Sequence, residues 1–185
     1  ADVSLVLPQS EEACPMGLAP TTSTTVMMAL GDAIAVAFLE RKGFSPEDFH
    51  ALHPGGKLGR LLLKVSDIMH SGEELPLIDQ DSLMSEALIE MSAKSFGCVG
   101  IVGPDGVLLG VITDGDLRRH MSHELIAKKT REVMTKGAQA INPEMLVSVA
   151  LGIMNVRAIT NIFVTKDDCP VGILHIHDCL RAGVA

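Results

Sequence analysis

The sequence predicts an α/β fold class: a strand and a helix of a doubly wound parallel sheet come first, and two copies of one small mixed module follow. The segment GVITDGDLRR, Gly110 to Arg119, returns near the end of the chain as GILHIHDCLR, Gly172 to Arg181. The same signals precede each copy: an acidic residue, an aliphatic residue and a methionine, then an amphipathic segment and an apolar run. A long repeat that occurs only twice predicts two packed modules and not a solenoid.

Composition argues against several classes of partner. The net charge of −8 and the pI near 5.3 argue against binding to a nucleic-acid backbone. The longest apolar stretch, Val26 to Leu39, is interrupted by Asp32 and is too short to span a bilayer. Four scattered cysteines without CxxC spacing indicate reduced thiols. We therefore expect a cytoplasmic protein with no nucleic-acid partner and no membrane contact.

The N-terminal segment predicts one strand and one long helix. Residues 1 to 7 form a short apolar run closed by Pro8, which favours a buried parallel strand. The hydroxyls of Thr21 to Thr25 can cap a helix over Val26 to Arg41, whose apolar residues lie all round and predict burial on more than one side. Gly43 is suited to end this helix. Because one strand cannot complete a parallel sheet, we expect part of this domain to precede the chain.

A linker separates this segment from the repeat. Ser45 and Pro46 predict a short helix, because proline suits the first helical position. His53-Pro54-Gly55-Gly56 then interrupts regular structure. The predicted domain organisation is a partial first domain at residues 1–44, a linker at 45–64, a first module at 65–125 and a second module at 131–185.

Each module is predicted to run strand, helix, strand, hairpin, strand, helix. In the first, the elements after the opening strand are helix Leu83 to Lys94, strand Cys98 to Val102, turn Pro104 to Gly106, strand Val107 to Thr113 and helix Asp114 to Met121. In the second, they are helix Val147 to Val156, strand Asn161 to Val164, turn Lys166 to Pro170, strand Val171 to Leu174 and helix His177 to Gly183. Neither module alone buries both faces of so small a sheet, so we expect the two to pack side by side.

The strand-to-helix corner Thr113-Asp114-Gly115-Asp116 carries chemistry that can serve a ligand. Free amides at a helix N-terminus favour a phosphate, and a carboxylate can accept hydrogen bonds from ribose hydroxyls. The alternative, that Thr113 and Asp116 only cap the helix, is about equally well supported by this motif. In the second module Asp178 is retained but His175 replaces the threonine. The two corners are therefore not equivalent.

The repeat resembles a tandem pair of CBS domains over about residues 65 to 185. The motif that carries the resemblance is an aliphatic-Met-[Thr/His] opening, an amphipathic helix and a closing Gly110, Thr113, Asp116 and Leu117. The resemblance implies a cleft for adenosine nucleotides or similar ligands, with the Asp on ribose and the Thr on a phosphate. By the same resemblance, Thr113, Asp116 and Glu132 form the better candidate site, and His175 and Asp178 form a degenerate one. Many such pairs only dimerise.

The whole chain also resembles the arabinose 5-phosphate isomerase family of bacterial sugar-phosphate isomerases. The matching segments are Glu12 to Pro15, Gly17 to Thr25, Leu30 to Ala33, His53 to Arg60 and the closing Leu180 to Val184. This family has an N-terminal sugar isomerase domain, a doubly wound parallel sheet, followed by two CBS domains. Its members interconvert D-ribulose 5-phosphate and D-arabinose 5-phosphate on the route to the lipopolysaccharide sugar Kdo.

Such an aldose-ketose exchange needs a base that moves a proton between adjacent carbons and an acid near the oxygens. The family resemblance places these tasks on Glu12, as base or orienting carboxylate, and on His53, as acid-base or ring-opening residue, with the roles exchangeable. The loop Pro8-Gln9-Ser10, at the carboxyl end of the predicted strand, is expected to touch substrate. The family's upstream phosphate loop and its other catalytic residues have no counterpart here, so we expect this chain to be an incomplete enzyme.

Three functions thus follow from the sequence. The preferred one is the C-terminal portion of an arabinose 5-phosphate isomerase with a regulatory CBS pair, acting on a sugar phosphate without cofactor or metal. The first alternative is a stand-alone CBS module that senses a nucleotide or a sugar nucleotide such as a CMP-activated sugar. The second is a pair that serves only to dimerise. In each case we expect a homo-oligomer, a dimer or a tetramer.

Overall fold

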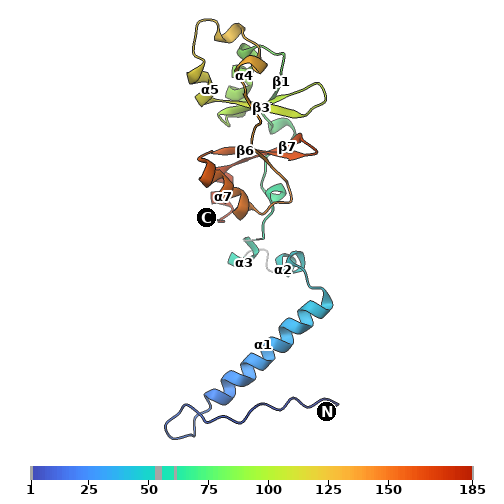
Figure 1. Cartoon of the computed structure of the whole chain (residues 1–185), viewed down its shortest axis with the longest axis vertical. Coiled ribbons are helices and arrows are strands. Elements are labelled where there is room, and N and C mark those ends of the chain that lie inside the picture. The colour runs from blue at the N-terminus through green and yellow to red at the C-terminus, as the bar shows by residue number, and fades with distance from the viewer. Residues whose placement is uncertain (1, 53–55, 61, 185) are drawn as a thin grey trace. The chain divides into compact units, whose positions relative to one another are not determined.

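The computed structural model describes residues 2–52, 56–60 and 62–184 of the chain. Its contacts divide the chain into two compact units, Ala1–Leu52 and His53–Ala185, which are described separately (Figure 1). The second unit holds the two modules of the repeat. The predicted loop at His53 to Gly55 lies outside the described residues.

The first unit consists of an extended segment and two helices, α1 (Thr22–Lys42) and α2 (Pro46–Leu52). Gly43 ends α1 in the left-handed conformation, with φ of 64°, as the sequence predicted. Asp48 accepts hydrogen bonds at its Oδ2 from the amide and the hydroxyl of Ser45, at 2.9 and 3.1 Å. These bonds satisfy donors at the start of α2, so the predicted helix start is confirmed.

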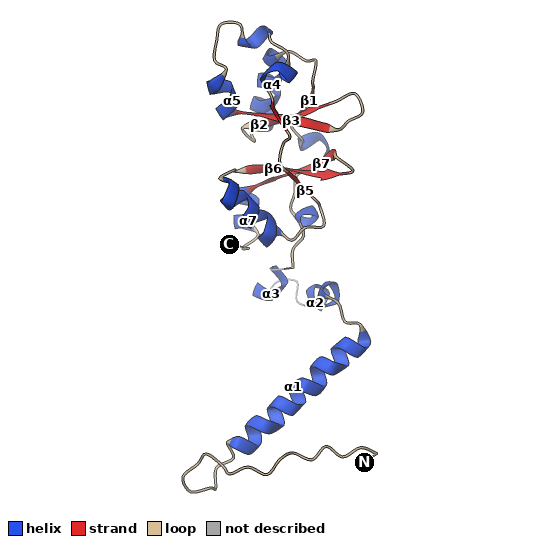
Figure 2. Cartoon of the chain, viewed as in Figure 1, coloured by secondary structure: helices blue, strands red, loops and turns tan. Residues whose placement is uncertain are grey.

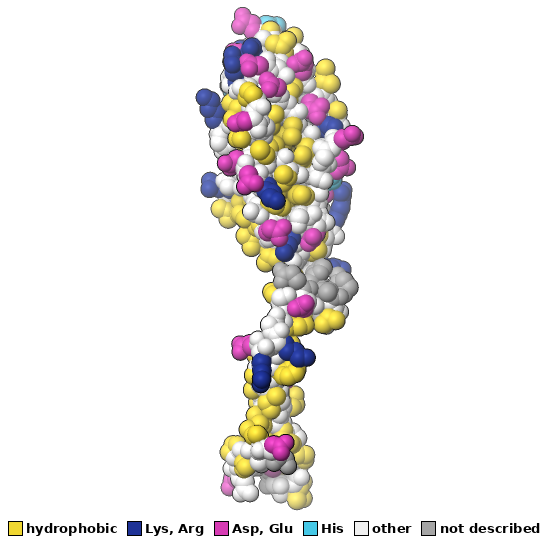
Figure 3. Space-filling model, turned by 90° about the vertical axis from the view of Figure 1, so that its right-hand side faces the viewer, with side chains coloured by type: hydrophobic (Ala, Val, Ile, Leu, Met, Phe, Trp, Pro, Cys, Tyr) yellow, Lys and Arg dark blue, Asp and Glu magenta, His cyan; other side chains and the backbone are white. Residues whose placement is uncertain are grey.

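Two predictions for this unit are wrong as they apply to this chain. The strand predicted over residues 1 to 7 is not formed: residues 2–7 are extended, with Val3 and Val6 78% and 87% exposed. A strand needs a partner for its backbone groups, and the described residues of this unit provide none. The burial predicted for α1 is also absent, because no described residue of α1 is buried. Figure 3 shows hydrophobic side chains on its surface.

α1 also satisfies a length criterion that the sequence interpretation had rejected. With 21 residues, it is long and apolar enough to cross a membrane by length and composition. A buried core helix of a soluble protein and a signal sequence near an N-terminus satisfy the same criterion, so one such helix does not identify a membrane span. The prediction of no membrane contact therefore remains a prediction.

The second unit contains two mixed sheets, each covered by helices (Figure 2). The first sheet has the strand order β1 (Leu77–Asp79), β2 (Cys98–Val102), β3 (Leu108–Thr113), β4 (Thr135–Lys136). Helices α4 (Met84–Lys94) and α5 (Asp114–Arg119) belong to the first module, whereas α6 (Thr130–Val133) and β4 come from the start of the second. In the second the order is β5 (Ala140–Ile141), β6 (Asn161–Lys166), β7 (Cys169–His175), with helices α7 (Val147–Arg157) and α8 (Ile176–Arg181). A short helix, α3 (Lys57–Arg60), precedes both modules.

The helix and strand pattern predicted for both modules is confirmed, with small shifts at the ends of elements. β2 has the predicted bounds, and Leu83 is the N-cap of α4 and not its first residue. The second hairpin is tighter than predicted, because β7 already begins at Cys169. Asp167 and Asp168 both have positive φ, 52° and 62°. Two consecutive left-handed residues allow a two-residue turn, so the strands extend closer to the loop.

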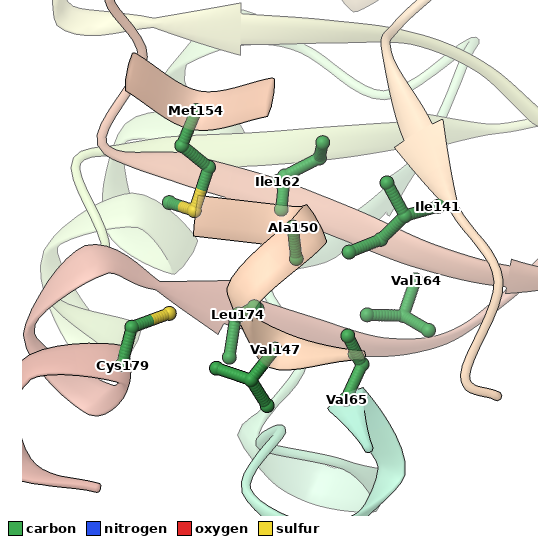
Figure 4. Packing of buried hydrophobic residues seen from close by; sticks show 9 residues of the cluster. All are labelled: Val65, Ile141, Val147, Ala150, Met154, Ile162, Val164, Leu174 and Cys179. Atoms are coloured by element: carbon green, nitrogen blue, oxygen red, sulfur yellow. The ribbon is translucent and has the colours of Figure 1, made fainter. Parts of the chain in front are cut away.

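The opening segment of each module, its entry segment, packs against the other module. The entry segments are residues 65–70 of the first module and 131–136 of the second. Val65, from the entry to the first module, lies in the core of the second with Val147 and Leu174 (Figure 4). Val133, from the entry to the second module, lies in the core of the first. β4 completes this exchange by pairing antiparallel with β3. The core of each module is thus completed by the entry segment of the other module.

The two sheets meet through a small apolar interface built from Cys98, Phe163 and Ile173. Gly100 and Phe163 occupy equivalent positions, since Gly100 pairs with the first residue of β1 and Phe163 with the first residue of β5. A Cβ atom on Gly100 would lie 2.8 Å from the Phe163 ring. The absent side chain of one module therefore makes room for the large side chain of the other. This fit is part of the apolar contact between the two modules.

Candidate functional site

A cleft of about 530 Å³ lies between the two modules. Its lining comes from the start of β2, the β3–α5 corner, the segment before β5 and the start of β6. The polar residues among those that line it are Thr113, Asp114, Arg118, Gln139, Thr160 and Asn161, and the apolar ones include Phe96, Val111, Ile159 and Phe163. An apolar hollow with a few polar groups is typical of a small-molecule site.

The first corner, defined as Thr113, Asp116 and Thr135, lies at the edge of this cleft. Asp116 is 2% exposed, and its Oδ2 accepts from the Thr113 amide at 2.9 Å and from the Thr113 hydroxyl at 2.6 Å. Its Oδ1 accepts from the Thr135 hydroxyl at 2.8 Å and from Arg119. The predicted pair Thr113 and Asp116 is thus brought together, and both cap α5.

These bonds keep Asp116 ionised. Burial opposes the charge of the carboxylate, but donors from Thr113, Thr135 and Arg119 outweigh it and hold the pKa of Asp116 below its ordinary value. Both oxygens are engaged within the protein, so the capping role that the sequence left open is real. Thr113, and not Asp116, is among the residues that line the cleft.

The second corner, defined as His175, Asp178 and His70, has the same backbone arrangement with different side chains. The His175 amide donates to Asp178 Oδ2 at 3.1 Å, as the Thr113 amide does to Asp116. His70 Nε2 lies 3.2 Å from the same Asp178 oxygen, and its Nδ1 lies 2.8 Å from Glu74 Oε2. His70 thus holds the position that Thr135 holds in the first corner, because each follows the methionine of its entry segment.

The imidazoles of the second corner are perturbed in opposite directions. For His70 the largest influence, burial, lowers the pKa, but hydrogen bonds to Glu74 and Asp178 outweigh it and raise the pKa above its ordinary value. For His175, burial and then the neighbouring His177 lower the pKa. The charges of His70 and His175 therefore change with pH near neutrality, where Asp116 of the first corner stays ionised.

Thr135 and His70 take part in these corners although the sequence did not single them out, and the ligand role predicted for Glu132 stays a prediction. Glu132 is exposed and caps α6, where its Oε1 accepts from the Lys129 amide at 3.3 Å. Thr135, three residues later, makes the contact to Asp116 instead. The signal was present in the Thr or His that follows each methionine. The sequence does not show that this residue contacts the aspartate of the other module, because that contact depends on how the entry segments are exchanged.

Glu12, the predicted catalytic carboxylate, lies at the N-terminus of α1. Its Oε2 accepts from the amides of Thr21 and Thr22, at 2.6 and 2.8 Å, and from the Thr21 hydroxyl at 2.9 Å. Hydrogen bonding from Ser23, the largest influence, and from Thr21 lowers the pKa of Glu12 to about 2. A carboxylate held by helix amides is stable in its charged form.

The other residues predicted to meet substrate can be placed only in part. Pro8, Gln9 and Ser10 line a groove of about 520 Å³ together with Val26 and Met27 of α1. The partner predicted for Glu12, His53, lies outside the described residues. In the part of the chain that the structure describes, no three His, Cys, Asp or Glu side chains gather to hold a metal ion. All four cysteines are free.

The family model of the CBS domain matches residues 65–123 and 131–185, which are the two modules described above. The chain belongs to the CBS-domain family. The full length of the chain is 47% identical to an arabinose 5-phosphate isomerase, KdsD, of Yersinia pestis, of which it covers 57%. The chain thus spans little more than half of that relative, as its C-terminal part.

Solved structures resemble the CBS pair in fold. One is CBSX2 in complex with AMP, with a TM-score of 0.58 and 19% identity over 65% of this chain and 96% of that one. Another is the CBS pair of protein MJ0100 in complex with 5′-methylthioadenosine and S-adenosyl-L-methionine, with a TM-score of 0.58 and 22% identity over 65% of this chain and 94% of that one. These likenesses establish the tandem CBS fold of the second unit.

Proposed function

We propose that the complete protein is an arabinose 5-phosphate isomerase that interconverts D-ribulose 5-phosphate and D-arabinose 5-phosphate for Kdo and lipopolysaccharide synthesis. The observation that supports this is the 47% identity to a KdsD enzyme over the whole chain, first unit included. The segments with Glu12 and His53 would have no use in a pure sensor. We expect the 185-residue chain alone to lack this activity, because it carries only part of the catalytic groups.

The structure bears on how the two catalytic tasks are divided. A general base works best when its pKa lies near the operating pH. The pKa of Glu12, lowered to about 2, makes this carboxylate a weak base but a firm anchor for the start of α1. We therefore assign Glu12 the orienting role and His53 the transfer of protons, with Pro8, Gln9 and Ser10 along the substrate groove.

Kinetics of the complete protein test this assignment. His53→Ala should lower kcat by at least about a hundredfold, the usual contribution of an acid-base group. Glu12→Gln should lower kcat but leave the pH profile unchanged, because it alters position and not proton transfer. Glu40→Gln and His123→Ala, both exposed and remote from these residues in the chain, are matched controls that should keep full activity. Full activity of His53→Ala would refute the assignment.

The CBS pair is proposed to bind a nucleotide, or a nucleotide-activated sugar such as the CMP-linked product of the pathway, in the cleft. The cleft volume of about 530 Å³ and the AMP complex of a similar fold support this function. A stand-alone sensor would use the same site, so the isomerase assay separates the two functions. A pair that only dimerises would bind nothing.

Calorimetry with AMP and CMP tests the cleft. One equivalent should bind per chain, and Thr113→Val should weaken binding about tenfold by removing a hydroxyl from the lining. His175→Ala, at the second corner, should have little effect. A stronger loss in His175→Ala than in Thr113→Val would place the ligand in the other corner.

We expect a cytoplasmic homo-oligomer, a dimer or a tetramer, of the complete protein. Light scattering at micromolar concentration would measure its mass. A strict monomer would contradict this assembly.

A further inference from the structure

Polar side chains are distributed unequally around the two equivalent halves of the CBS pair. The strand registers and the two corners define which positions of the two modules correspond. Three polar residues of the cleft, Arg118, Gln139 and Asn161, correspond in this way to Leu180, Pro76 and Cys98. None of these three counterparts carries a charge or an amide. The cleft beside the first corner is therefore the one equipped to recognise a polar ligand.

Asn161 is held in one orientation across the module boundary. It begins β6 of the second module, and its Nδ2 donates to the backbone oxygen of Phe96 in the first, at 2.6 Å. Turning the amide over would place two oxygens against each other, so the side chain cannot reverse. Its Oδ1 is buried and has no hydrogen-bond partner among the residues that the structure describes.

An unpaired buried oxygen of this kind is unusual. Most buried polar side-chain atoms have at least one partner, and leaving an acceptor unmatched is unfavourable. Because the orientation of Asn161 is fixed, its oxygen cannot turn toward another donor of the protein. Asn161 lines the cleft. A molecule that fills the cleft can supply the missing donor, provided that the packing around this oxygen opens when the molecule binds.

We propose that Asn161 determines the specificity of the cleft by accepting a hydrogen bond from the exocyclic amino group of a nucleobase. The inference rests on the nucleotide site proposed above. It selects adenine and cytosine, which carry such a group, over hypoxanthine and uracil, which have a carbonyl oxygen in its place. The carbonyl oxygen of hypoxanthine or uracil is an acceptor like Asn161 Oδ1, so the two oxygens would repel each other. Of the described residues that line the cleft, Arg118 alone is a cation, and it suits the phosphate.

The test compares two matched pairs of ligands on the 185-residue chain by calorimetry: AMP with IMP, and CMP with UMP. The wild type should bind the amino member of at least one pair about tenfold more tightly than the carbonyl member. A preference within the AMP and IMP pair would identify the base as a purine, and one within the CMP and UMP pair would identify it as a pyrimidine. Equal affinities within both pairs would overturn the proposal.

Two substitutions separate the acceptor from the contact with Phe96. Asn161→Leu removes both groups at similar volume, so the preference should fall to about onefold. Asn161→Asp keeps an acceptor oxygen but loses the donor, so the preference should persist even where overall affinity drops. A preference that survives in Asn161→Leu, or that vanishes in Asn161→Asp, would overturn the role. If Asn161→Leu fails to fold, the wild type and Asn161→Asp decide the question.

Arg118→Leu is the control, because leucine is the residue at the equivalent position of the second module. It should weaken binding of all four nucleotides by a similar factor and leave the preference unchanged. A change of preference in this variant would contradict the assignment of base recognition to Asn161. Failure of all four nucleotides to bind the wild type would refute the nucleotide site itself, whereas binding without preference refutes only the inference on Asn161.

Discussion

The two corners of the CBS pair share one backbone arrangement and differ in how their aspartates are held. In the first corner, two threonine hydroxyls and an arginine surround Asp116, which is 2% exposed. In the second, the imidazole of His70 takes the place of the Thr135 hydroxyl, Arg181 lies 3.6 Å from Asp178 Oδ1, and the side chain of Asp178 is 11% exposed. The repeat thus conserves the capping geometry while it changes the donor chemistry. One corner is fixed across neutral pH and the other can titrate.

Of the changes considered, removal of each aspartate should give the largest difference in stability between the two corners. Asp116→Ala should lower the free energy of unfolding by about 3 kcal/mol, because it leaves the donors of Thr113 and Thr135 without an acceptor. Asp178→Ala should cost about 1 kcal/mol, since its surroundings are more open to water. Because the chain has no Trp or Tyr, circular dichroism during urea titration is the suitable measurement.

Glu124→Ala, an exposed position in the loop before the second module, is the matched control for this comparison. It should change stability by less than about 0.5 kcal/mol. Equal losses for Asp116→Ala and Asp178→Ala would mean that the two corners are equivalent in stability despite their different donors.

Gly110 and Gly172, the first residues of the two repeated motifs, test how rigidly the two entry segments pack, because each glycine lies against one of these segments. A Cβ on Gly110 would lie 2.6 Å from the backbone oxygen of Thr135, which cannot move independently of β4. A Cβ on Gly172 would instead press mainly on the end of the flexible Met69 side chain. Gly110→Ala should therefore cost about 2 to 3 kcal/mol and Gly172→Ala about 1 kcal/mol, measured by the same titration. The reverse order would show that the second entry segment packs more rigidly than the first.

Local patterns in the sequence predicted most of the second unit. The closing motif located the turn from β3 into α5, and the apolar runs located β2 and α7, because each depends on residues near in the chain. The strand-to-helix corner and the family resemblance both indicated Thr113 and Asp116 as a pair. These features required no knowledge of how the modules pack.

Long-range contacts account for what the sequence did not predict. Nothing near Val65 indicates that it packs with the second module, and nothing near His70 indicates Asp178 as its partner. The contacts of Glu12 with the amides at the start of α1, nine to eleven residues away, were also not evident from the sequence. The strand predicted over residues 1 to 7 presumed neighbouring strands that the described unit does not contain.

The smallest expected effect concerns pH and tests whether the second corner titrates as its contacts indicate. Because the folded-state pKa of His70 is raised, its contribution to stability is fully present below the unfolded value of 6.5 and is lost as pH rises through the folded value. His175 acts in the opposite sense, since its lowered pKa makes acidification below 6.5 unfavourable. The pH dependence of the wild type alone would mix the two effects.

The difference between wild type and His70→Thr reports mainly on the first of them, because the substitution installs the residue of the first corner. It also removes the charge of His70 that helps to lower the pKa of His175. This difference in unfolding free energy should grow by about 0.5 kcal/mol as the pH falls from about 8 to 6, as expected for a partly exposed ion pair. Thr135→Val, which removes the equivalent donor from the first corner, should give a difference that is flat over the same range. A flat difference for His70→Thr would mean that His70 does not change charge against Glu74 and Asp178, and the contrast between a fixed and a titrating corner would not hold.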